Sequence, residues 1–300
     1  MMDIDRYDVV VMGSGAAGLT AALAAHGHGA SVVVLEKAEQ LGGTSAWSGG
    51  MIWIPNNPLM QRAGISDSRD EALTYLRSLS HDLIPDELAL SYVDHGPEMV
   101  AWLLANTPVA FAMVDQFPDY HPEFPGGKPQ GGRSLECPLM SFKELGTHAD
   151  RVTVGSNYGT APVSMAESNL GRAVPVPVSE EEMQRRRLED MRGCGQSLIG
   201  HLLKACLQRD IEIRTQAAAT DLLVENGVVT GVLYNFVGAQ RQLACENVVL
   251  ASGGFEWNQD LVRAFLRGPM THPVSVPTNQ GDALLMCMRI GVSLGNMREA

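Results

Sequence analysis

A glycine-rich turn between two apolar strands constrains this chain more than any other feature. Asp8 to Met12 is a short apolar run rich in β-branched residues, and it leads directly into Gly13-Ser14-Gly15-Ala16-Ala17-Gly18. This Gly-x-Gly-x-x-Gly pattern is typical of a strand that turns into a helix beside a pyrophosphate. The first glycine permits the tight turn, the second lets backbone approach the phosphates, and the third lets the helix press on the strands.

A second strand follows the predicted helix and ends in an acid. Ala16 to Ala25 supplies the helix, whose N-terminal N–H groups and dipole would face the phosphates. Ser31 to Leu35 reads as the strand, and Glu36 comes 18 residues after Gly18, close to the roughly 20 expected for an acid that binds a ribose diol. A carboxylate there would repel a 2′-phosphate, so the pattern indicates a dinucleotide other than NADP.

Gly42 to Met51 departs from an ordinary nicotinamide-binding domain, which would continue here with a helix. The stretch holds two glycine pairs and three hydroxyl side chains, so we expect a loop whose backbone lies against a flat ring system and whose N–H groups reach a second phosphate. A flexible surface loop is the alternative, but Trp47 and the run from Ile52 to Ile54 are too apolar for a solvated linker.

Bulk composition excludes several classes of function. The chain has 300 residues, 45% hydrophobic content, a net charge of −12 and a pI near 5.1, which is enough for a sizeable core and speaks against nucleic acid or anionic membrane as a partner. The first residues show no apolar leader and no later run has the length of a membrane span, so we expect a cytoplasmic protein. Five scattered cysteines without a Cys-x-x-Cys pair indicate reduced thiols, and we predict no metal site, because His26 and His28 lack carboxylate partners.

The middle of the chain predicts helices and one long loop. Ser66 to Asn106 reads as packing helices, whereas Phe111 to Met140 is rich in proline, glycine and aromatic residues and predicts an ordered loop. A capping box at Ser179 to Glu182 begins a helix that we expect to reach Arg192. Arg185 to Arg187 within it reads as a solvated face rather than an anion site. Cys194 has no histidine close by in sequence, so we do not expect a nucleophile there.

The last third predicts more of the sheet. Ile211 to Arg214 looks like a further parallel strand, and the Asn-Gly turn at 226–227 joins two antiparallel strands. Gln242 to Ala244 is a candidate third antiparallel strand, and Asn247 to Ala251 returns to an apolar strand. The chain is therefore predicted to be an α/β protein with a mainly parallel sheet, covering helices and an inserted antiparallel β-meander.

Several of these motifs together resemble the fumarate reductase/succinate dehydrogenase flavoprotein superfamily, and the match extends over most of the chain. They are Gly13-x-Gly15-x-x-Gly18, Glu36-Lys37, Gly42-Gly43-Thr44-Ser45 and Ser48-Gly49-Gly50. The run from Trp47 to Asn57 is more narrowly similar to the 3-ketosteroid Δ1-dehydrogenases within that superfamily.

The resemblance implies a Rossmann-like domain that binds FAD. It implies backbone contact with the adenine end at Ala218, and contact with the flavin side at the turn that ends in Asp282, for which helix capping is the alternative. The residues expected to bind FAD are Gly13, Ser14, Gly15, Ala16, Ala17, Gly18, Glu36, Lys37, Ala38, Gly42, Gly43, Thr44, Ser45, Ser48, Gly49, Gly50, Met51, Ala218, Ala251, Ser252, Gly253 and Asp282.

The resemblance also implies a substrate pocket, with Phe117 as an apolar wall and Tyr120 as an accessory catalytic residue. The alternative for Tyr120 is a packed loop aromatic with a satisfied hydroxyl. We expect an FAD-binding domain over residues 1–298, in which 107–194 is a loop-rich insertion that contributes to the pocket. Family members continue with a cap domain and a segment that completes the flavin site, so we expect this chain to be the N-terminal part of a longer protein.

The leading hypothesis is an FAD-dependent dehydrogenase that removes two hydrogens from adjacent carbons next to a ketone, most like 3-ketosteroid Δ1-dehydrogenation. A base takes a proton made acidic by the carbonyl, the flavin N5 accepts a hydride, and an external acceptor reoxidises the flavin. The first alternative is a fumarate reductase-like flavoprotein that acts on a dicarboxylate or enoate. The second is a non-catalytic FAD-binding fragment, and a third, an NAD-dependent dehydrogenase, is disfavoured by the double-glycine loop.

Overall fold

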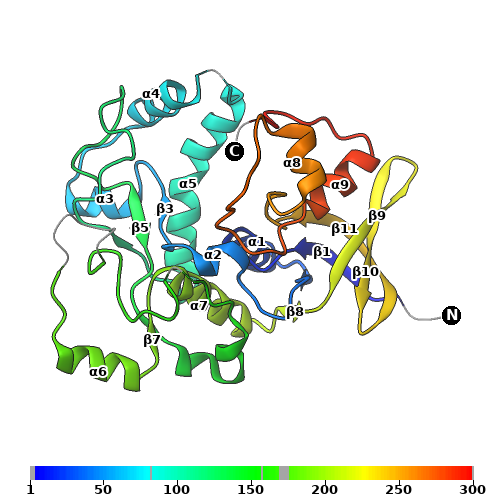
Figure 1. The fold of residues 1–300 in the computed structure, drawn as a ribbon, viewed down its shortest axis with the longest axis horizontal. Coiled ribbons are helices and arrows are strands. Elements are labelled where there is room, and N and C mark those ends of the chain that lie inside the picture. Colours follow the sequence, from blue (N-terminus) through cyan, green and yellow to red (C-terminus); the bar gives the residue numbers. More distant parts are fainter. Residues whose placement is uncertain (1–3, 82, 157, 169–175, 299–300) are drawn as a thin grey trace. The chain divides into compact units, whose positions relative to one another are not determined.

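The computed structural model describes residues 4–81, 83–156, 158–168 and 176–298 (Figure 1). The chain forms two compact units. Unit 1 comprises residues 1–47, 145–157 and 202–300, and unit 2 comprises residues 48–144 and 158–201. Unit 2 begins at Ser48, and the predicted division into an FAD-binding domain over 1–298 with a loop-rich insertion at 107–194 stays a prediction.

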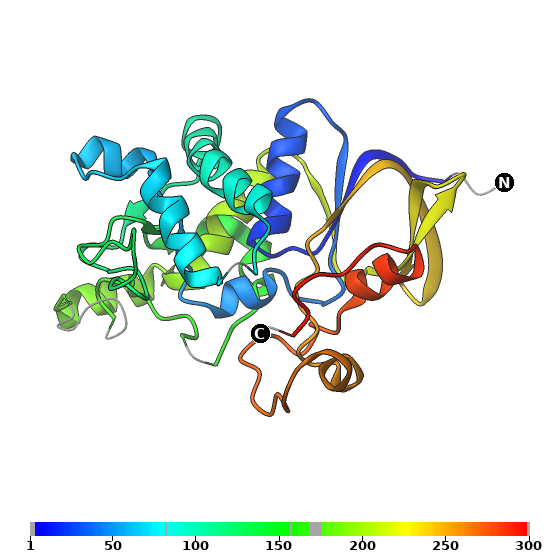
Figure 2. The ribbon, with the colours of Figure 1, turned by 90° about the horizontal axis from the view of Figure 1, so that it is seen from above.

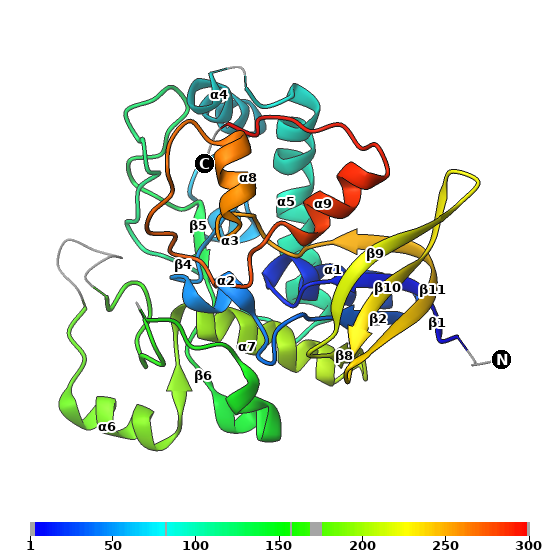
Figure 3. The same ribbon diagram turned by 45° about the vertical axis from the view of Figure 1, so that its right-hand side comes forward.

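Unit 1 is built on a six-stranded sheet with the order β8-β2-β1-β11-β10-β9, whose strands Figure 3 shows side by side. The three strands β8, β2 and β1 are parallel to one another and β11 is parallel to β1, whereas β9, β10 and the first half of β11 form an antiparallel meander. The bounds are β1 Arg6–Met12, β2 Val32–Leu35, β8 Glu212–Arg214, β9 Ala218–Glu225, β10 Val228–Phe236 and β11 Ala239–Leu250.

Burial explains why the parallel strands pair in this way. All four residues of β2 and the last four of β1 are buried, as expected of strands covered on both faces. The core on one face of the sheet joins them to the meander through Val10, Val33, Val232 and Leu243. The predicted α/β fold, with a mainly parallel sheet and an inserted meander, is confirmed.

Helices flank this sheet in unit 1. α1 follows β1 directly, and Leu19, Ala22 and Leu23 on its inner face are fully buried. In Figure 2, α9 lies alongside the strands of the β9–β10 hairpin. The helices of unit 1 are α1 Ala16–Gly27, α2 Gly43–Trp47, α8 Gln259–Phe265 and α9 Asp282–Arg289.

Unit 2 consists of helices and short strands. Its helices are α3 Pro58–Ala63, α4 Arg69–Ser80, α5 Asp86–Asn106 and α6 Glu180–Leu188, and its strands are β3 Ile52–Trp53, β4 Ala112–Met113, β5 Ser134–Glu136, β6 Met140–Ser141 and β7 Met191–Arg192. The 3₁₀ segment η1 Phe142–Arg151 and the helix α7 Cys194–Leu207 each have residues in both units. No helix in the described part of the chain is long and apolar enough to cross a membrane.

Three local expectations were wrong. Residues 43–47 form the short helix α2 instead of a loop, and α6 ends at Leu188 because Met191–Arg192 pairs with β6. The two strands expected at 242–244 and 247–251 are one strand, β11, which changes partner from β10 to β1 at Ala244. No turn residue separates the two segments of β11, which is consistent with one strand. The alternation of apolar and polar residues does not show that this strand pairs with two different strands.

The arginine run of α6 is only partly the solvated face that the sequence suggests. Arg185 and Arg187 are exposed, but Arg186 is buried and pairs with Glu167 at 2.8 Å and with Glu182 at 2.7 Å. The long aliphatic part of the Arg186 side chain lets its guanidinium group reach a buried position, where it pairs with two carboxylates.

Candidate functional site

The predicted glycine turn packs as tightly as its spacing requires. Gly13 has φ of +107°, and a Cβ placed on it would lie 2.3 Å from the Ala251 carbonyl oxygen. A Cβ on Gly18 would lie 2.0 Å from the Gly13 carbonyl oxygen. Both obstacles are backbone atoms of neighbouring elements, so only glycine lets β1, α1 and the end of β11 meet here.

The N-terminus of α1 is kept open. Its N-cap is Gly15, with no side-chain cap and no acidic residue in the first turn. Four other helices are capped by a side chain, from Asn57, Ser68, Ser179 and Asn258. Because α1 has no N-cap side chain of its own and no acid in its first turn, its positive end suits an anion such as a pyrophosphate.

Glu36 is buried behind the turn and oriented by three donors. The Ser14 N–H and hydroxyl donate to Glu36 Oε2 at 3.0 and 2.6 Å, and the Ala38 N–H donates to Oε1 at 2.8 Å. Ser14 Oγ also accepts the Gly42 N–H at 2.9 Å, and Ser45 Oγ accepts the Ala16 N–H at 3.1 Å. The second glycine segment therefore lies directly against the first turn, as a single bound dinucleotide would require.

These elements enclose a cavity of about 310 Å³ in unit 1, called the first cavity here. Of the predicted FAD-binding residues, the structure places Gly13, Ser14, Gly15, Ala16, Ala17, Glu36, Lys37, Gly43, Thr44, Ser45, Ala251, Ser252, Gly253 and Asp282 in its lining. Gly18, Ala38, Gly42 and Ala218 do not line it; for Ala218 the neighbours Ala217 and Ala219 do, since alternate residues of a strand face opposite sides.

Sequence reasoning missed part of the lining, chiefly Val276 and Met286, and it included Asn279 only as a member of the turn that ends in Asp282. Thr44 Oγ1 accepts hydrogen bonds from the Val276 N–H and the Asn279 side chain, both at 3.3 Å. Asn279 comes three residues before Asp282 in the turn that opens α9, so its proximity to the predicted Asp282 was the available signal. Asp282 itself pairs with Lys37 across the cavity.

The residues that line the first cavity fit the bound dinucleotide that the amino-acid sequence predicts. Its floor is backbone and small side chains, its helix end is uncapped, and the buried Ser252 hydroxyl finds no hydrogen-bond partner among the described residues. Buried hydroxyls normally have a partner. The turn at Gly13 to Ala17 would hold the phosphates and Glu36 a ribose.

The remaining predicted FAD residues, Ser48, Gly49, Gly50 and Met51, belong to unit 2. Gly50 has φ of +70°, and a Cβ on it would lie 2.4 Å from the Cys194 carbonyl group. The Gly195 N–H donates to the Ser48 carbonyl at 2.9 Å. The second glycine pair thus packs the chain against the start of α7, and a flavin contact at these residues stays a prediction.

A second cavity, of about 360 Å³, lies within unit 2. Met51, Trp53, Tyr75, Leu76, Leu79, Phe117, Pro118, Asp119, Tyr120, His121 and Ser134 line it. Phe117 and Tyr120 come together here, edge to face, with ring centroids 6.2 Å apart, and Tyr120 is 81% exposed. The ring of Tyr120 is therefore exposed rather than packed among the described residues, and its catalytic role stays a prediction. No lysine or arginine is among the lining residues, which favours a neutral, largely apolar ligand.

Cys194 is buried at the start of α7, where burial, assisted by the nearby Glu136 charge, raises the pKa of its thiol to about 12. A thiol with so high a pKa is a poor nucleophile at neutral pH. Among the described residues, no group of three or more histidine, cysteine or acidic side chains is arranged to hold a metal ion.

Comparison with known proteins places this site in a family. Residues 8–300 match the family model described as FAD binding domain. The chain is 36% identical over 321 residues to the 3-oxosteroid 1-dehydrogenase of Mycobacterium tuberculosis strain H37Rv, covering 100% of this chain and 56% of the relative. It is 39% identical over 302 residues to the 4-oxocyclohexanecarboxylate 2-dehydrogenase of Sinomonas cyclohexanicum, with 98% and 51% covered.

A solved structure agrees. The 3-ketosteroid Δ1-dehydrogenase of Sterolibacterium denitrificans, in complex with 1,4-androstadiene-3,17-dione, has a TM-score of 0.85 and 32% identity, covering 98% of this chain and 56% of that one. The chain thus spans about half the length of the relatives it matches. The uncapped α1, the buried acid and the match over residues 8–300 lead to one conclusion: this chain belongs to the FAD-binding domain family and its cofactor is FAD.

Proposed function

We propose that this protein is an FAD-dependent dehydrogenase that introduces a carbon–carbon double bond next to the ketone of a six-membered ring, with a 3-ketosteroid as substrate. The names of two relatives support the reaction type. Dehydrogenation at C1 of a 3-oxosteroid and at C2 of a 4-oxocyclohexanecarboxylate both begin two carbons from the ketone. The carbon between the ketone and this position carries a proton that the carbonyl makes acidic. This suits removal of a proton from that carbon and of a hydride from the next one.

The second cavity is the observation that carries the substrate class. Its walls are mainly aromatic and aliphatic, with Asp119, His121 and Ser134 as the polar members, and no lysine or arginine is among its lining residues. The guanidinium of Arg133, which lies behind it, is completely buried and already paired with Asp67 and Asp119. A dicarboxylate such as fumarate, or a ring carboxylate, would enter without a counter-charge, at a large desolvation cost. A neutral steroid would bury apolar surface against Trp53 and Phe117 instead.

The chain's own residues have separate roles in this proposal. FAD, when bound, supplies the hydride acceptor. Phe117 forms an apolar wall of the second cavity and excludes water. Tyr120 presents its exposed hydroxyl to the ligand, where it would donate a hydrogen bond to the group that takes the proton. Tyrosine has a reference pKa of about 10, so it needs neighbouring donors or positive charge to act as a base near neutral pH.

The remaining partners are part of the same proposal. An external electron acceptor must reoxidise the flavin after each turnover. All five cysteines are free thiols, which supports a reducing compartment such as the cytoplasm.

Substrate discrimination tests the proposal directly. Purified full-length protein is mixed under anaerobic conditions with a saturated 3-ketosteroid, with 4-oxocyclohexanecarboxylate, or with succinate, and bleaching of the flavin absorbance is followed. We expect bleaching with the steroid and slow or no bleaching with the two anions. Bleaching by 4-oxocyclohexanecarboxylate alone would overturn the steroid assignment, and bleaching by succinate alone would overturn the reaction type.

Replacing Tyr120 with phenylalanine tests its role. The variant keeps the edge-to-face ring contact but loses the hydroxyl, so we expect kcat to fall about 10² to 10⁴-fold with flavin content unchanged. Tyr234→Phe is the control, because Tyr234 lines neither cavity and its hydroxyl accepts a hydrogen bond from Arg214 Nη1 at 2.6 Å. Unchanged turnover in Tyr120→Phe would remove Tyr120 from the mechanism.

A further inference from the structure

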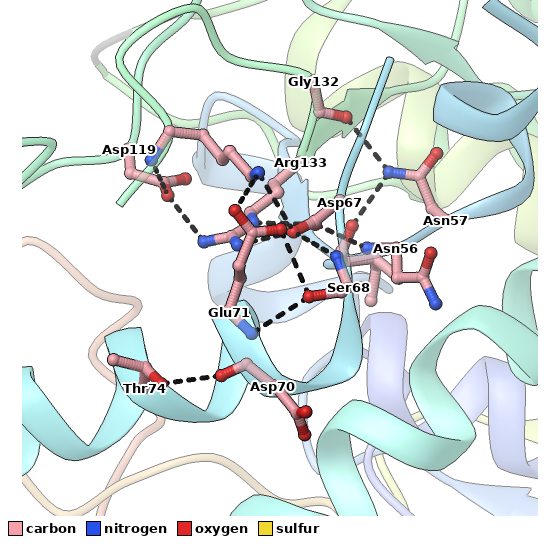
Figure 4. Close-up of polar contacts among 12 residues, drawn as sticks. Asn56, Asn57, Asp67, Ser68, Asp70, Glu71, Thr74, Asp119, Gly132 and Arg133 are labelled. Atoms are coloured by element: carbon pink, nitrogen blue, oxygen red, sulfur yellow. Dashed lines mark hydrogen bonds and ion pairs between the residues drawn. The ribbon is translucent and has the colours of Figure 1, made fainter. Parts of the chain in front are cut away.

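A buried arginine lies behind the wall of the second cavity. The Arg133 side chain has no exposed surface, and its Nε and Nη2 donate to the two carboxylate oxygens of Asp67 at 2.9 and 2.7 Å. Its Nη1 donates to Asp119 Oδ2 at 2.9 Å (Figure 4). Both carboxylate side chains are 1% exposed. The cation is therefore fully committed to protein groups, and its role must be exerted through them.

Asp119 ties the loop between Phe117 and Tyr120 to its surroundings. Besides Arg133, it accepts hydrogen bonds from Trp53 Nε1 at 2.7 Å and from the Lys128 N–H at 2.9 Å. The Asp119 N–H in turn donates to the Lys128 carbonyl at 3.1 Å. The residue directly before Tyr120 is thus held through both side chain and backbone.

The residue directly after Tyr120 is also held. The His121 N–H donates to the Tyr75 hydroxyl at 3.2 Å. The guanidinium carbon of Arg133 lies 5.6 Å from the centroid of the Tyr75 ring and 5.3 Å from that of Trp53. Both anchors of Tyr120 therefore contact the same buried cation, one through an ion pair and the other through a cation–π contact.

Burying this cluster of charges costs free energy, so its presence points to a role other than stability. Removing three charges from water costs several kcal/mol per ion, and apolar replacements of such clusters are often neutral or stabilising. Tyr120 is 81% exposed, so its ring contributes little packing that would fix the loop. An exposed side chain on a rigidly held backbone is what a site needs when a polar group must meet a ligand at a defined position.

We propose that Arg133, Asp67 and Asp119 form a positioning cluster that fixes Phe117 and Tyr120 in the wall of the second cavity. The proposal rests on the function proposed for that cavity. The three residues are positioning residues: Arg133 and Asp67 do not line the cavity, and Asp119, which does, directs its carboxylate to Arg133, Trp53 and Lys128. Their loss therefore lowers turnover through the placement of Tyr120.

Two variants disturb the cluster to different degrees. Asp119→Asn keeps the shape but removes the anion that faces Arg133. Tyr75→Phe is milder, because it removes only the acceptor of the His121 N–H and keeps the ring. Glu167→Gln is the matched control: it weakens a comparable pair with Arg186, at 2.8 Å, in the same unit, and Glu167 does not line the cavity.

Steady-state kinetics of the full-length holoenzyme give the first readout. We expect Asp119→Asn to lower kcat for the ketosteroid about tenfold and Tyr75→Phe about threefold, with little change in KM or flavin content. In a Tyr120→Phe background both effects on kcat should disappear, since the hydroxyl whose placement they change is absent. Losses that persist undiminished in that background would overturn the proposal, as would full turnover in a folded Asp119→Asn protein.

Hydrogen exchange of residues 117–128 provides a second readout that does not need activity. We expect slow exchange in the wild type and in Glu167→Gln, and faster exchange in Tyr75→Phe and Asp119→Asn. If Asp119→Asn does not fold, Tyr75→Phe carries both tests. A wild type that oxidises no cyclic ketone contradicts the proposed function alone, whereas rapid exchange of this loop in the wild type contradicts the positioning cluster.

Discussion

The two cavities of this chain are built from different materials. The first cavity is lined largely by backbone and small residues at the ends of strands and helices, and a Cβ on its Gly13 would strike the backbone of Ala251. The second cavity is formed by large aromatic side chains whose loop is held by buried charges. A backbone-built site suits a cofactor shared by a whole family, whereas a side-chain-built site suits a substrate that differs between members.

The strongest test of this contrast is Gly18→Ala. The added Cβ would meet the Gly13 carbonyl oxygen at 2.0 Å, and neither backbone segment can move away without breaking β1 or α1. We expect loss of bound FAD by absorbance at 450 nm, or loss of soluble protein. Gly268→Ala is the control, because nothing lies within 4 Å of its added Cβ and its φ is not positive. A Gly18→Ala protein with its full content of FAD would contradict the conclusion that close backbone packing at this turn is required for the first cavity.

Arg133→Met tests the side-chain half. Removing the cation leaves the buried Asp119 without its ion-pair partner and Asp67 with only Lys128 Nζ, at 3.6 Å, so we expect the free energy of unfolding to fall by about 3–5 kcal/mol. Urea denaturation measures it, with the exposed Arg185→Met, which should change little, as control. Flavin affinity of the folded variant should hold. If the folded Arg133→Met protein also bound FAD more weakly, the side chains that hold the second cavity would also support the first cavity, and the comparison would fail.

Glu36→Gln should have a smaller effect, on the cofactor alone. Glu36 accepts three hydrogen bonds as an anion, and the amide turns one oxygen into a donor that faces donors. We expect the Kd for FAD to rise about 10- to 100-fold, equivalent to about 1.4–2.8 kcal/mol. Titration of apoprotein with FAD measures it, and the exposed Glu39→Gln serves as control. An unchanged Kd would show that the buried acid does not bind the ribose.

The smallest expected effect is at Cys194, which packs against Met51 and Phe117 in the core beside the second cavity. With its pKa raised to about 12, the thiol stays protonated at pH 8. Iodoacetamide at that pH should label the less buried Cys287 and leave Cys194 unmodified in the native protein, as peptide mass spectrometry would show. Rapid labelling of Cys194 would indicate that the wall around it opens.

Most of the first cavity could be predicted, and less of the second. Gly13 to Ala17 and Glu36 follow from local spacing, because a strand, a turn and a helix of fixed lengths place them together, and Ser45 was named from the family motif that contains it. Asn279 lies in the turn that the resemblance predicts to contact the flavin side, but its hydrogen bond to Thr44, 235 residues away in sequence, could not be predicted. The aromatic loop was recognised through Phe117 and Tyr120, but its anchors at Asp67, Asp119 and Arg133 were not.

The order of the main strands and helices along the chain could be predicted from the sequence. Periodicity, glycine spacing and turn residues act over a few residues, and they were sufficient to predict the βαβ unit, the meander and a dinucleotide site. Only the tertiary structure decided that β11 joins both halves of the sheet and that Arg133 is buried between two acids. Ion pairing and burial depend on neighbours far apart in the chain, and a charged residue in a polar loop looks the same in sequence whether water or two carboxylates surround it.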